Sequence, residues 1–223
     1  APAVRRALLA GHTLTGWERL GYARAYGIEE GRFVEIPWPL CRWGGEPQRD
    51  VAEVGSKVMS SGRAHTDWET LFSAARGSEW DLTVSCSTLD AASVRAMNDV
   101  GADVHVELTR AEHDHLLRES DVYVMAMREA GASAGHVRLM AAVEAGTPVV
   151  ASDIRALEGY AESGTTAVLV RPGDSAELRA AVDALLADPD ERRRLRDAAL
   201  ARARGWTYED YFDRIRALVL NRG

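Results

Sequence analysis

The sequence has few cysteines, almost no lysine and no long apolar run. Its two cysteines among 223 residues, Cys41 and Cys86, argue against a disulfide framework and predict reduced thiols in a cytoplasmic protein. Lys57 is the one lysine, and all other basic residues are arginines, a bias typical of high-GC bacterial genomes. No segment approaches the ~18 consecutive apolar residues of a membrane-spanning helix, and no signal peptide is evident.

Negative charge outweighs positive charge. The chain carries 34 acidic and 27 basic residues, a net charge of −7. This balance excludes a general electrostatic attraction to nucleic acid or to an acidic membrane, and it leaves room only for a local basic patch. A length of 223 residues allows one large domain or one domain plus a fragment, and a hydrophobic content of 46% is enough for a core. Because the chain starts APAVRR without a methionine, we expect a processed or truncated piece.

Short apolar segments alternate with helical patterns from Lys57 onward. Strands are expected at 58–61, 82–86, 104–108, 122–125, 149–151 and 168–170. Helices are expected at 67–76, 91–100, 178–186, 191–204 and 208–220, with one more opened by a capping box at Thr109 and Glu112. This alternation predicts an α/β fold, a doubly wound parallel six-stranded Rossmann-like sheet.

The first 50 residues follow a different pattern. A short strand at 5–9, a helix at 15–26, a strand at 32–37 and a Pro/Gly/Trp-rich linker at 37–45 are expected there. This is too little for a second domain and is typical of the end of one. We therefore expect an N-terminal remnant with a linker over 1–45, the Rossmann-like domain over 46–205 and a closing helical segment over 206–223.

The segment from Glu129 to Asp153 predicts an anion site. A loop of small residues precedes a helix, which a Gly-Thr-Pro sequence separates from a buried strand. Gly131 and Gly135 allow close approach of the backbone, and the first N–H groups of the helix, near His136 and Val137, are free to bind an anion. The alternative is an ordinary strand-to-helix connection that binds nothing.

A second anion-binding feature follows the first predicted strand. Ser60, Ser61 and Gly62 form a small turn, and Arg63 then offers a bidentate donor to a phosphate. Ligands of open α/β sheets bind beyond the carboxyl ends of the strands, where this turn lies. The alternative is an exposed arginine after a tight turn.

The sequence GTPVVASD at 146–153, preceded by a helix, resembles the C-terminal donor-binding domain of GT-B glycosyltransferases, in particular the retaining, glycogen-synthase-like group 1 enzymes. Further segments resemble the family in the same order. They are residues 29–40, 61–63, 120–124 and 168–174, and the closing segment that starts at Trp206. The resemblance therefore covers nearly the whole chain.

The resemblance implies transfer of a sugar from a nucleoside diphosphate sugar with retention, without a metal or another cofactor. It implies that Arg63 and the N–H groups at 135–137 stabilise the leaving diphosphate. The base would lie against the backbone near Val106 and Glu107, and the sugar near Ser133–His136. The acceptor would be a glycan, a lipid or a small metabolite. The missing upstream domain would hold it, and a peripheral membrane contact through that domain stays open.

Two acids of the family pattern are absent. Counted back from Gly146, the positions of its Glu-x7-Glu motif fall on Ser133 and Ala141, and Glu129 and Glu144 are the nearest acids. The predicted catalytic residues are Arg63, Glu129 and Ser133, and the predicted donor-binding residues are Gly62, Val106, Gly131, Gly135, His136, Val137 and Glu144.

Two other functions stay open. One is a non-catalytic nucleotide-binding or interaction module of the same fold, which the absent acids favour. The other is a nucleotide-sugar epimerase, which needs acid/base carboxylates in the cleft. We expect the chain alone to bind a nucleotide without turnover.

Three further patterns favour structural interpretations. Residues 112–115, Glu-His-Asp-His, are interpreted as a solvated helix face because His113 and His115 are two positions apart. The arginine-rich run 192–204 is interpreted as a solvated amphipathic helix. Trp38 and Trp43 are interpreted as linker packing, with an interdomain cleft as the alternative.

Overall fold

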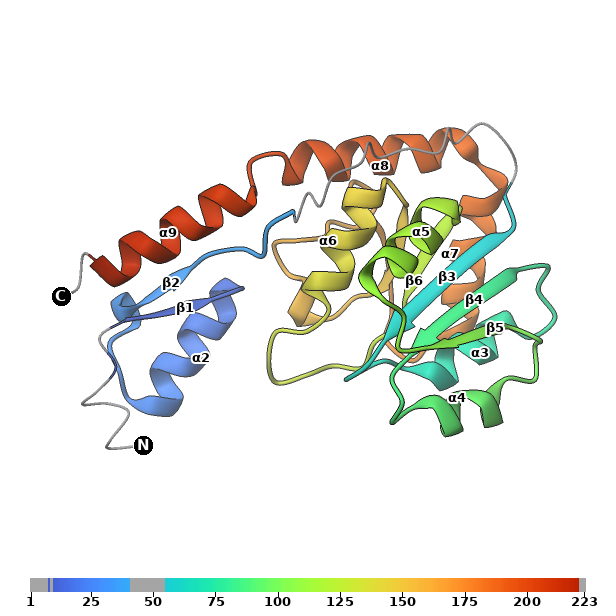
Figure 1. The fold of residues 1–223 in the computed structure, drawn as a ribbon, viewed down its shortest axis with the longest axis horizontal. Coiled ribbons are helices and arrows are strands. Elements are labelled where there is room, and N and C mark those ends of the chain that lie inside the picture. The colour runs from blue at the N-terminus through green and yellow to red at the C-terminus, as the bar shows by residue number, and fades with distance from the viewer. Residues whose placement is uncertain (1–7, 9, 41–54, 221–223) are drawn as a thin grey trace.

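A computed structural model describes residues 8, 10–40 and 55–220. The chain forms a larger α/β domain and a small N-terminal unit, and the last helix runs alongside the small unit (Figure 1). Cys41, Trp43, most of the linker expected at 37–45 and all but Leu8 of the strand expected at 5–9 lie outside the described residues.

The larger domain is built on a six-stranded parallel sheet. Its strands are β3 (Lys57–Gly62), β4 (Asp81–Cys86), β5 (Asp103–Val106), β6 (Val122–Met125), β7 (Val149–Ser152) and β8 (Val168–Val170). They lie in the order β5-β4-β3-β6-β7-β8. The predicted doubly wound Rossmann-like sheet is confirmed. The strand order reverses between β3 and β6, which is where such sheets leave a crevice for a ligand.

Helices cover both faces of the sheet (Figure 1). They are α3 (Trp68–Ala75), α4 (Ala91–Met97), α5 (Arg110–Glu119), α6 (His136–Ala145), α7 (Ser175–Ala187) and α8 (Pro189–Ala203), with a 3-10 turn η2 at Arg155–Leu157. Side chains of β6 alternate between the two layers. Tyr123 packs with Leu117 of α5 in one core cluster, and Val124 packs with Leu71 of α3 in the other. Alternation along a strand that is buried on both faces explains its continuous apolar sequence.

Local polar signals begin and end several of these helices. At α5 the Thr109 side chain accepts from the Glu112 N–H and the Glu112 carboxylate accepts from the Thr109 N–H, so the predicted capping box is confirmed. Asp67 caps α3 through the Thr70 N–H. Gly146 ends α6 with φ of 75°, a left-handed conformation that glycine adopts without a steric penalty.

The small unit contains two parallel strands, β1 (Gly11–Thr13) and β2 (Phe33–Glu35), with the helix α2 (Gly16–Tyr26) and a 3-10 turn η1 (Glu30–Arg32). Helix α9 (Tyr208–Leu220) returns from the larger domain to this unit. Tyr211 Oη lies 3.2 Å from His12 Nε2, and Arg214 donates to the Glu35 carbonyl at 2.9 Å. The chain therefore connects the two parts twice, before β3 and after α8.

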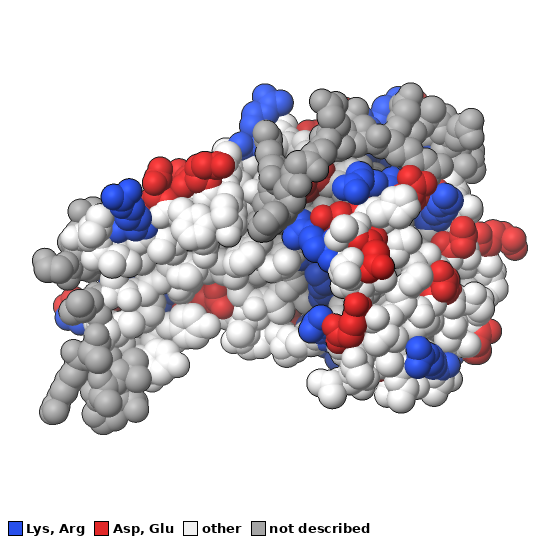
Figure 2. Space-filling view, in the orientation of Figure 1, with Lys and Arg blue, Asp and Glu red and all other residues white. Residues whose placement is uncertain are grey.

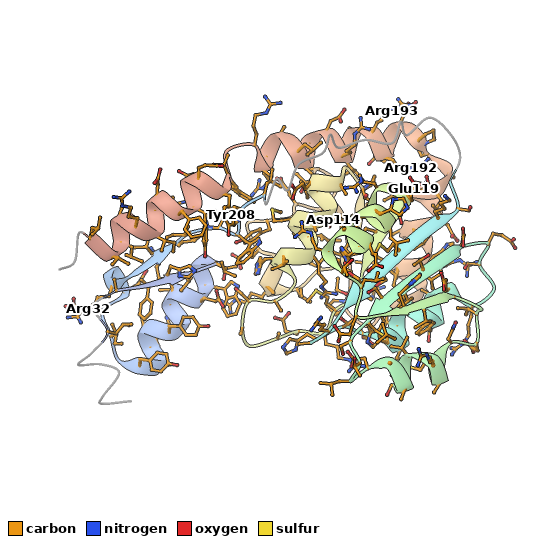
Figure 3. All side chains as sticks on the ribbon, in the orientation of Figure 1. Arg32, Asp114, Glu119, Arg192, Arg193 and Tyr208 are labelled. Atoms are coloured by element: carbon orange, nitrogen blue, oxygen red, sulfur yellow. The ribbon has the colours of Figure 1, made fainter. Side chains whose placement is uncertain are left out.

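One residue of the arginine-rich run does not match its interpretation. Arg192 is fully buried and donates to the carbonyls of Leu185 and Leu186 at 2.5 and 2.6 Å, the last turn of α7. Arg193 is partly exposed and pairs with Asp190 (Figure 3). The solvated-face interpretation is wrong for Arg192, because the carbonyls that end α7 need a donor and α8 folds back over them.

No helix in the described part of the chain is both long and apolar enough to cross a bilayer.

Candidate functional site

A cavity of about 690 Å³ opens at the carboxyl ends of β3, β4 and β5. This volume is typical of a small-molecule site. Its walls come from the turn after β3, the ends of β4 and β5, helix α5, the start of α6, and Leu14 and Trp38 of the N-terminal part. Figure 2 shows basic side chains in a band down the middle of this face of the molecule, although the chain as a whole is acidic.

Helix α6 presents its N-terminus to this cavity. Gly135 is its N-cap, and His136, Val137 and Arg138 follow, all four among the lining residues. The first N–H groups of a helix have no intrahelical acceptor and carry a partial positive charge. Gly135 has φ of 88°, and a Cβ there would lie 2.9 Å from the Met127 sulfur. Glycine is therefore required for this close turn.

Two more arginines reach the same space from the sheet edge. Arg63 follows β3 and pairs with Glu107 at 2.5 Å, with 73% of its side chain exposed to solvent. Arg110 begins α5 and pairs with Asp114 at 2.6 Å. An exposed pair such as Arg63–Glu107 is weak, so a phosphate can displace the carboxylate.

Arg138 is held more firmly than Arg63. Its guanidinium donates to the Ser61 carbonyl and, at 3.3 Å, to the Thr66 hydroxyl. A Cβ at Gly62 would collide with Thr66 and lie 2.5 Å from the same guanidinium. The glycine after β3 therefore makes the space in which Arg138 lies.

The backbone of the cavity is unusual at two positions. His65 and Glu107, both lining residues, have φ of 62° and 54°. Positive φ is uncommon outside glycine, and it clusters at functional sites because the surrounding structure must hold it.

His113 belongs to the cavity and not to a solvated face. Its Nε2 lies 2.8 Å from Ser61 Oγ, which lies 2.6 Å from the Tyr123 hydroxyl. Burial lowers the pKa of His113, although the nearby Asp114 opposes this, so the ring is neutral at pH 7. The solvated-face interpretation is therefore wrong for His113. It lies four positions before the buried Leu117, on the core side of α5.

The comparisons with known proteins address this fold and site. A family model described as glycosyl transferases group 1 matches residues 68–188, more than half of the chain. The chain belongs to this family. A search of curated protein sequences finds no match.

Solved glycosyltransferase structures share the fold. Sucrose-phosphate synthase from Thermosynechococcus elongatus aligns with a TM-score of 0.76 and 21% identity over 93% of this chain and 57% of that one. HepE from Anabaena, in complex with UDP and glucose, aligns with a TM-score of 0.80 and 16% identity over 98% of this chain and 65% of HepE. A TarM mutant from S. aureus was solved in complex with fondaparinux, α-GlcNAc-glycerol and UDP. It aligns with a TM-score of 0.77 and 13% identity over 97% of this chain and 45% of TarM. This glycosyl transferase chain thus spans about half to two-thirds of their lengths.

Six of the ten predicted site residues line the cavity of this glycosyl transferase chain. Those lining it are Gly62, Arg63, Ser133, Gly135, His136 and Val137, whereas Val106, Glu129, Gly131 and Glu144 are not among the lining residues. Glu129 accepts from the Arg155 N–H at 3.3 Å, and Glu144 lies 3.8 Å from Arg110. Neither acid that is nearest to the family motif in the sequence therefore faces the cavity.

Several lining residues were not predicted from the sequence. They are Leu14, the Glu107 side chain, Arg110, His113 and Arg138, whereas Ser61 belongs to the predicted turn after the first strand. A charged residue in the otherwise apolar and small-residue first half of α6 is a signal that could have identified Arg138. Trp38 also lines the cavity, in agreement with the cleft alternative.

The first residue of α6 packs against an aromatic ring of the larger domain. His136 is buried, and its ring is tilted against that of Tyr160, with ring centroids 4.2 Å apart. Burial lowers the pKa of His136, against a hydrogen bond with the Ala156 backbone and the charge of Glu18, which both raise it. A neutral, buried imidazole therefore lies at the first position of the helix.

Proposed function

We propose that this chain is the donor-binding part of a retaining glycosyltransferase that needs no metal and transfers a sugar from a nucleoside diphosphate sugar to an acceptor. One observation carries the proposal. The free N-terminus of α6 and the guanidinium groups of Arg63 and Arg138 line the same cavity at the strand ends. Two phosphate groups match this concentration of fixed positive charge.

The chemistry follows from where charge develops. When the bond between the sugar and the diphosphate breaks, negative charge grows on the leaving diphosphate. The N–H groups at His136 and Val137 and the guanidinium of Arg63 would stabilise that charge without reorganising. These donors can supply the charge that a bound metal supplies elsewhere, which is the physical basis for a metal-independent reaction.

The two ends of the cavity are assigned to the two ends of the donor. The base would lie at the ends of β4 and β5, against the backbone of Val106 and Glu107. The sugar would lie at the Ser133–His136 loop, next to Leu14 and Trp38. Glu129 and Glu144 would reach the donor only after the loop or α6 rearranges.

Residues 46–205 are proposed as the donor domain and residues 1–45 as the end of an acceptor domain. The acceptor, which we propose to be a glycan, a lipid or a small metabolite, would be bound by the part that these glycosyltransferases have and this chain lacks. We therefore propose that the chain alone binds a nucleotide without turning over a donor. HepE and TarM are in complex with UDP, which makes UDP the first nucleotide to test.

The proposal is tested by thermal unfolding with UDP, ADP, GDP and their glucose conjugates, with EDTA or Mg²⁺. A nucleotide at ~100 times its dissociation constant should stabilise the chain by about 2.7 kcal/mol, equally with and without Mg²⁺. Arg63→Ala should remove most of that shift, while Arg118→Ala, at an exposed position in the last turn of α5 and outside the cavity, should retain it. No shift with any nucleotide would reject the proposal.

A non-catalytic module is the second candidate, because Ser133 and Ala141 stand where the resemblance places two acids. It is separated from the first by activity. A chain completed with its upstream domain that binds UDP-sugars but neither transfers nor hydrolyses them would favour the module.

A further inference from the structure

Glu18 of α2 is a buried acid at the junction between the two parts of the chain. Its side chain belongs to the small unit, but its Oε1 accepts from the Ser133 N–H of the loop before α6 at 2.8 Å, 115 positions away in the sequence. Its Oε2 accepts from the Leu14 N–H at 3.2 Å. Glu18 is 5% exposed, and both of its backbone partners line the cavity. The carboxylate thus lies directly behind the wall at the proposed sugar end.

Glu18 carries its charge in this position. Burial alone would raise its pKa, but hydrogen bonds from the Ser133 side chain and backbone and from the Leu14 backbone lower it. The groups that face the carboxylate are His136 from α6 and Tyr22 from its own helix, whose hydroxyl lies 3.4 Å away. A buried carboxylate is tolerated only while its hydrogen bonds are made, so its presence fixes the Ser133 N–H.

Other contacts dock the same part of α2 beside this loop. The Thr15 hydroxyl lies 3.3 Å from the Ser133 hydroxyl. Arg155 of η2, whose N–H donates to Glu129 at the other end of the loop, stacks over the Trp17 ring at 5.1 Å. The loop from Glu129 to Gly135 is therefore in contact with Thr15 and Glu18 at the start of α2, and Arg155 links it to Trp17.

We infer that Glu18 is a positioning residue for the diphosphate site. It holds the loop before α6 so that the free N–H groups after Gly135 face the cavity, and it does so only while α2 is docked. The anion site of the sheet domain is thereby completed by the small unit. This inference rests on the proposed function for its ligand, but the hydrogen bond that carries it is independent of any ligand.

The first experiment needs no nucleotide. Hydrogen–deuterium exchange of the peptide that covers residues 131–137 is measured in the 223-residue chain and in Glu18→Ala, Glu18→Gln and Glu30→Ala. Glu30 is the matched control, because it lies in the same unit and forms an exposed pair with Arg19 at 2.8 Å. Exchange in Glu18→Ala should rise about tenfold, the effect of losing one charge-assisted hydrogen bond. Glu18→Gln, which keeps an acceptor, should show a smaller rise, and Glu30→Ala none.

The second experiment separates positioning from general damage. Calorimetric affinities for UDP and for uridine are compared in the same proteins. Glu18→Ala should lower the affinity for UDP about tenfold and leave the affinity for uridine unchanged, because the loop contacts the diphosphate and not the base. Glu18→Gln should recover part of the affinity for UDP.

Unchanged exchange at 131–137 in Glu18→Ala would overturn the inference, and so would equal weakening of UDP and uridine. If the unmodified chain binds neither ligand, the proposed function fails, while the exchange experiment still decides whether Glu18 holds the loop.

Discussion

Tyr160 donates its hydroxyl hydrogen to the backbone carbonyl of Leu14 at 2.9 Å, although 146 positions separate the two residues. The same hydroxyl accepts from the Trp38 N–H at 2.7 Å, and the ring packs on His136. One side chain of the larger domain thus binds two backbone groups of the N-terminal part while it contacts the first residue of α6. The position of the small unit and the wall of the cavity are therefore physically linked.

Tyr160→Phe should destabilise the chain by about 1–3 kcal/mol, because the substitution leaves a carbonyl and an N–H without their partner and keeps the ring packing. Urea unfolding measures the change. Tyr26→Phe, at a site where the ring is 40% exposed, serves as the control and should change stability by less than about 0.5 kcal/mol. Equal effects of the two substitutions would contradict the link.

Arg192→Ala should destabilise the chain by about 2–4 kcal/mol. The fully buried guanidinium donates to carbonyls in the last turn of α7. Its removal leaves those carbonyls unpaired and creates a void where the side chain was. The neighbouring Arg193→Ala, which removes only a surface pair, should cost less than about 1 kcal/mol. Thermal unfolding of both variants checks this, and a small effect of Arg192→Ala would show that α7 ends stably without it.

Gly62→Ala should displace Thr66 and Arg138, because the added Cβ would occupy their space. We expect a loss of about 1–3 kcal/mol in stability and weaker nucleotide binding. Gly205→Ala is the control outside the site, since Gly205 is exposed and a Cβ there meets nothing within 4 Å. The prediction fails if Gly62→Ala unfolds at the same temperature as Gly205→Ala and binds UDP equally well.

Stability should fall as the pH is lowered from 7 to 5. Burial lowers the pKa of His113 and of His136 in the folded chain. Histidines of the unfolded chain have a pKa of about 6.5, so below that pH the unfolded chain binds more protons than the folded chain. The stabilisation by the neutral rings is complete above that value and is lost as the pH falls through the lowered pKa. His113→Asn should flatten the dependence of unfolding free energy on pH, whereas His115→Asn, at an exposed position, should leave the slope unchanged.

Short-range patterns predicted the elements of the sheet domain closely. The strand 122–125 was predicted with the bounds of β6, and the capping box at Thr109 was predicted with both of its hydrogen bonds, because an apolar run and a cap depend on residues a few positions apart. Helix α4 ends at Met97, earlier than the predicted 100, because the Asn98 side chain binds the Ala102 backbone and turns the chain.

The cavity was predicted in part. Arg63, Gly135 and His136 were found because they follow a strand or begin a helix, where a ligand site is expected. The spacing of His113 to His115 favours a solvated face, whereas its spacing to Leu117 indicates the core side of α5. No local pattern connects Glu18 or Leu14 with a loop more than a hundred residues later.

The sequence by itself determined the six strands, the capping box of α5 and the presence of a free helix N-terminus after a small-residue loop, because periodicity, caps and glycines act within a few residues. The tertiary structure decided which side chains share the cavity. Strand order places Arg63, Glu107 and Arg138 together from three separate segments, and the docking of α2 buries Glu18 against Ser133. Burial and the pairing of charges depend on neighbours in space, and this is why they required the folded chain.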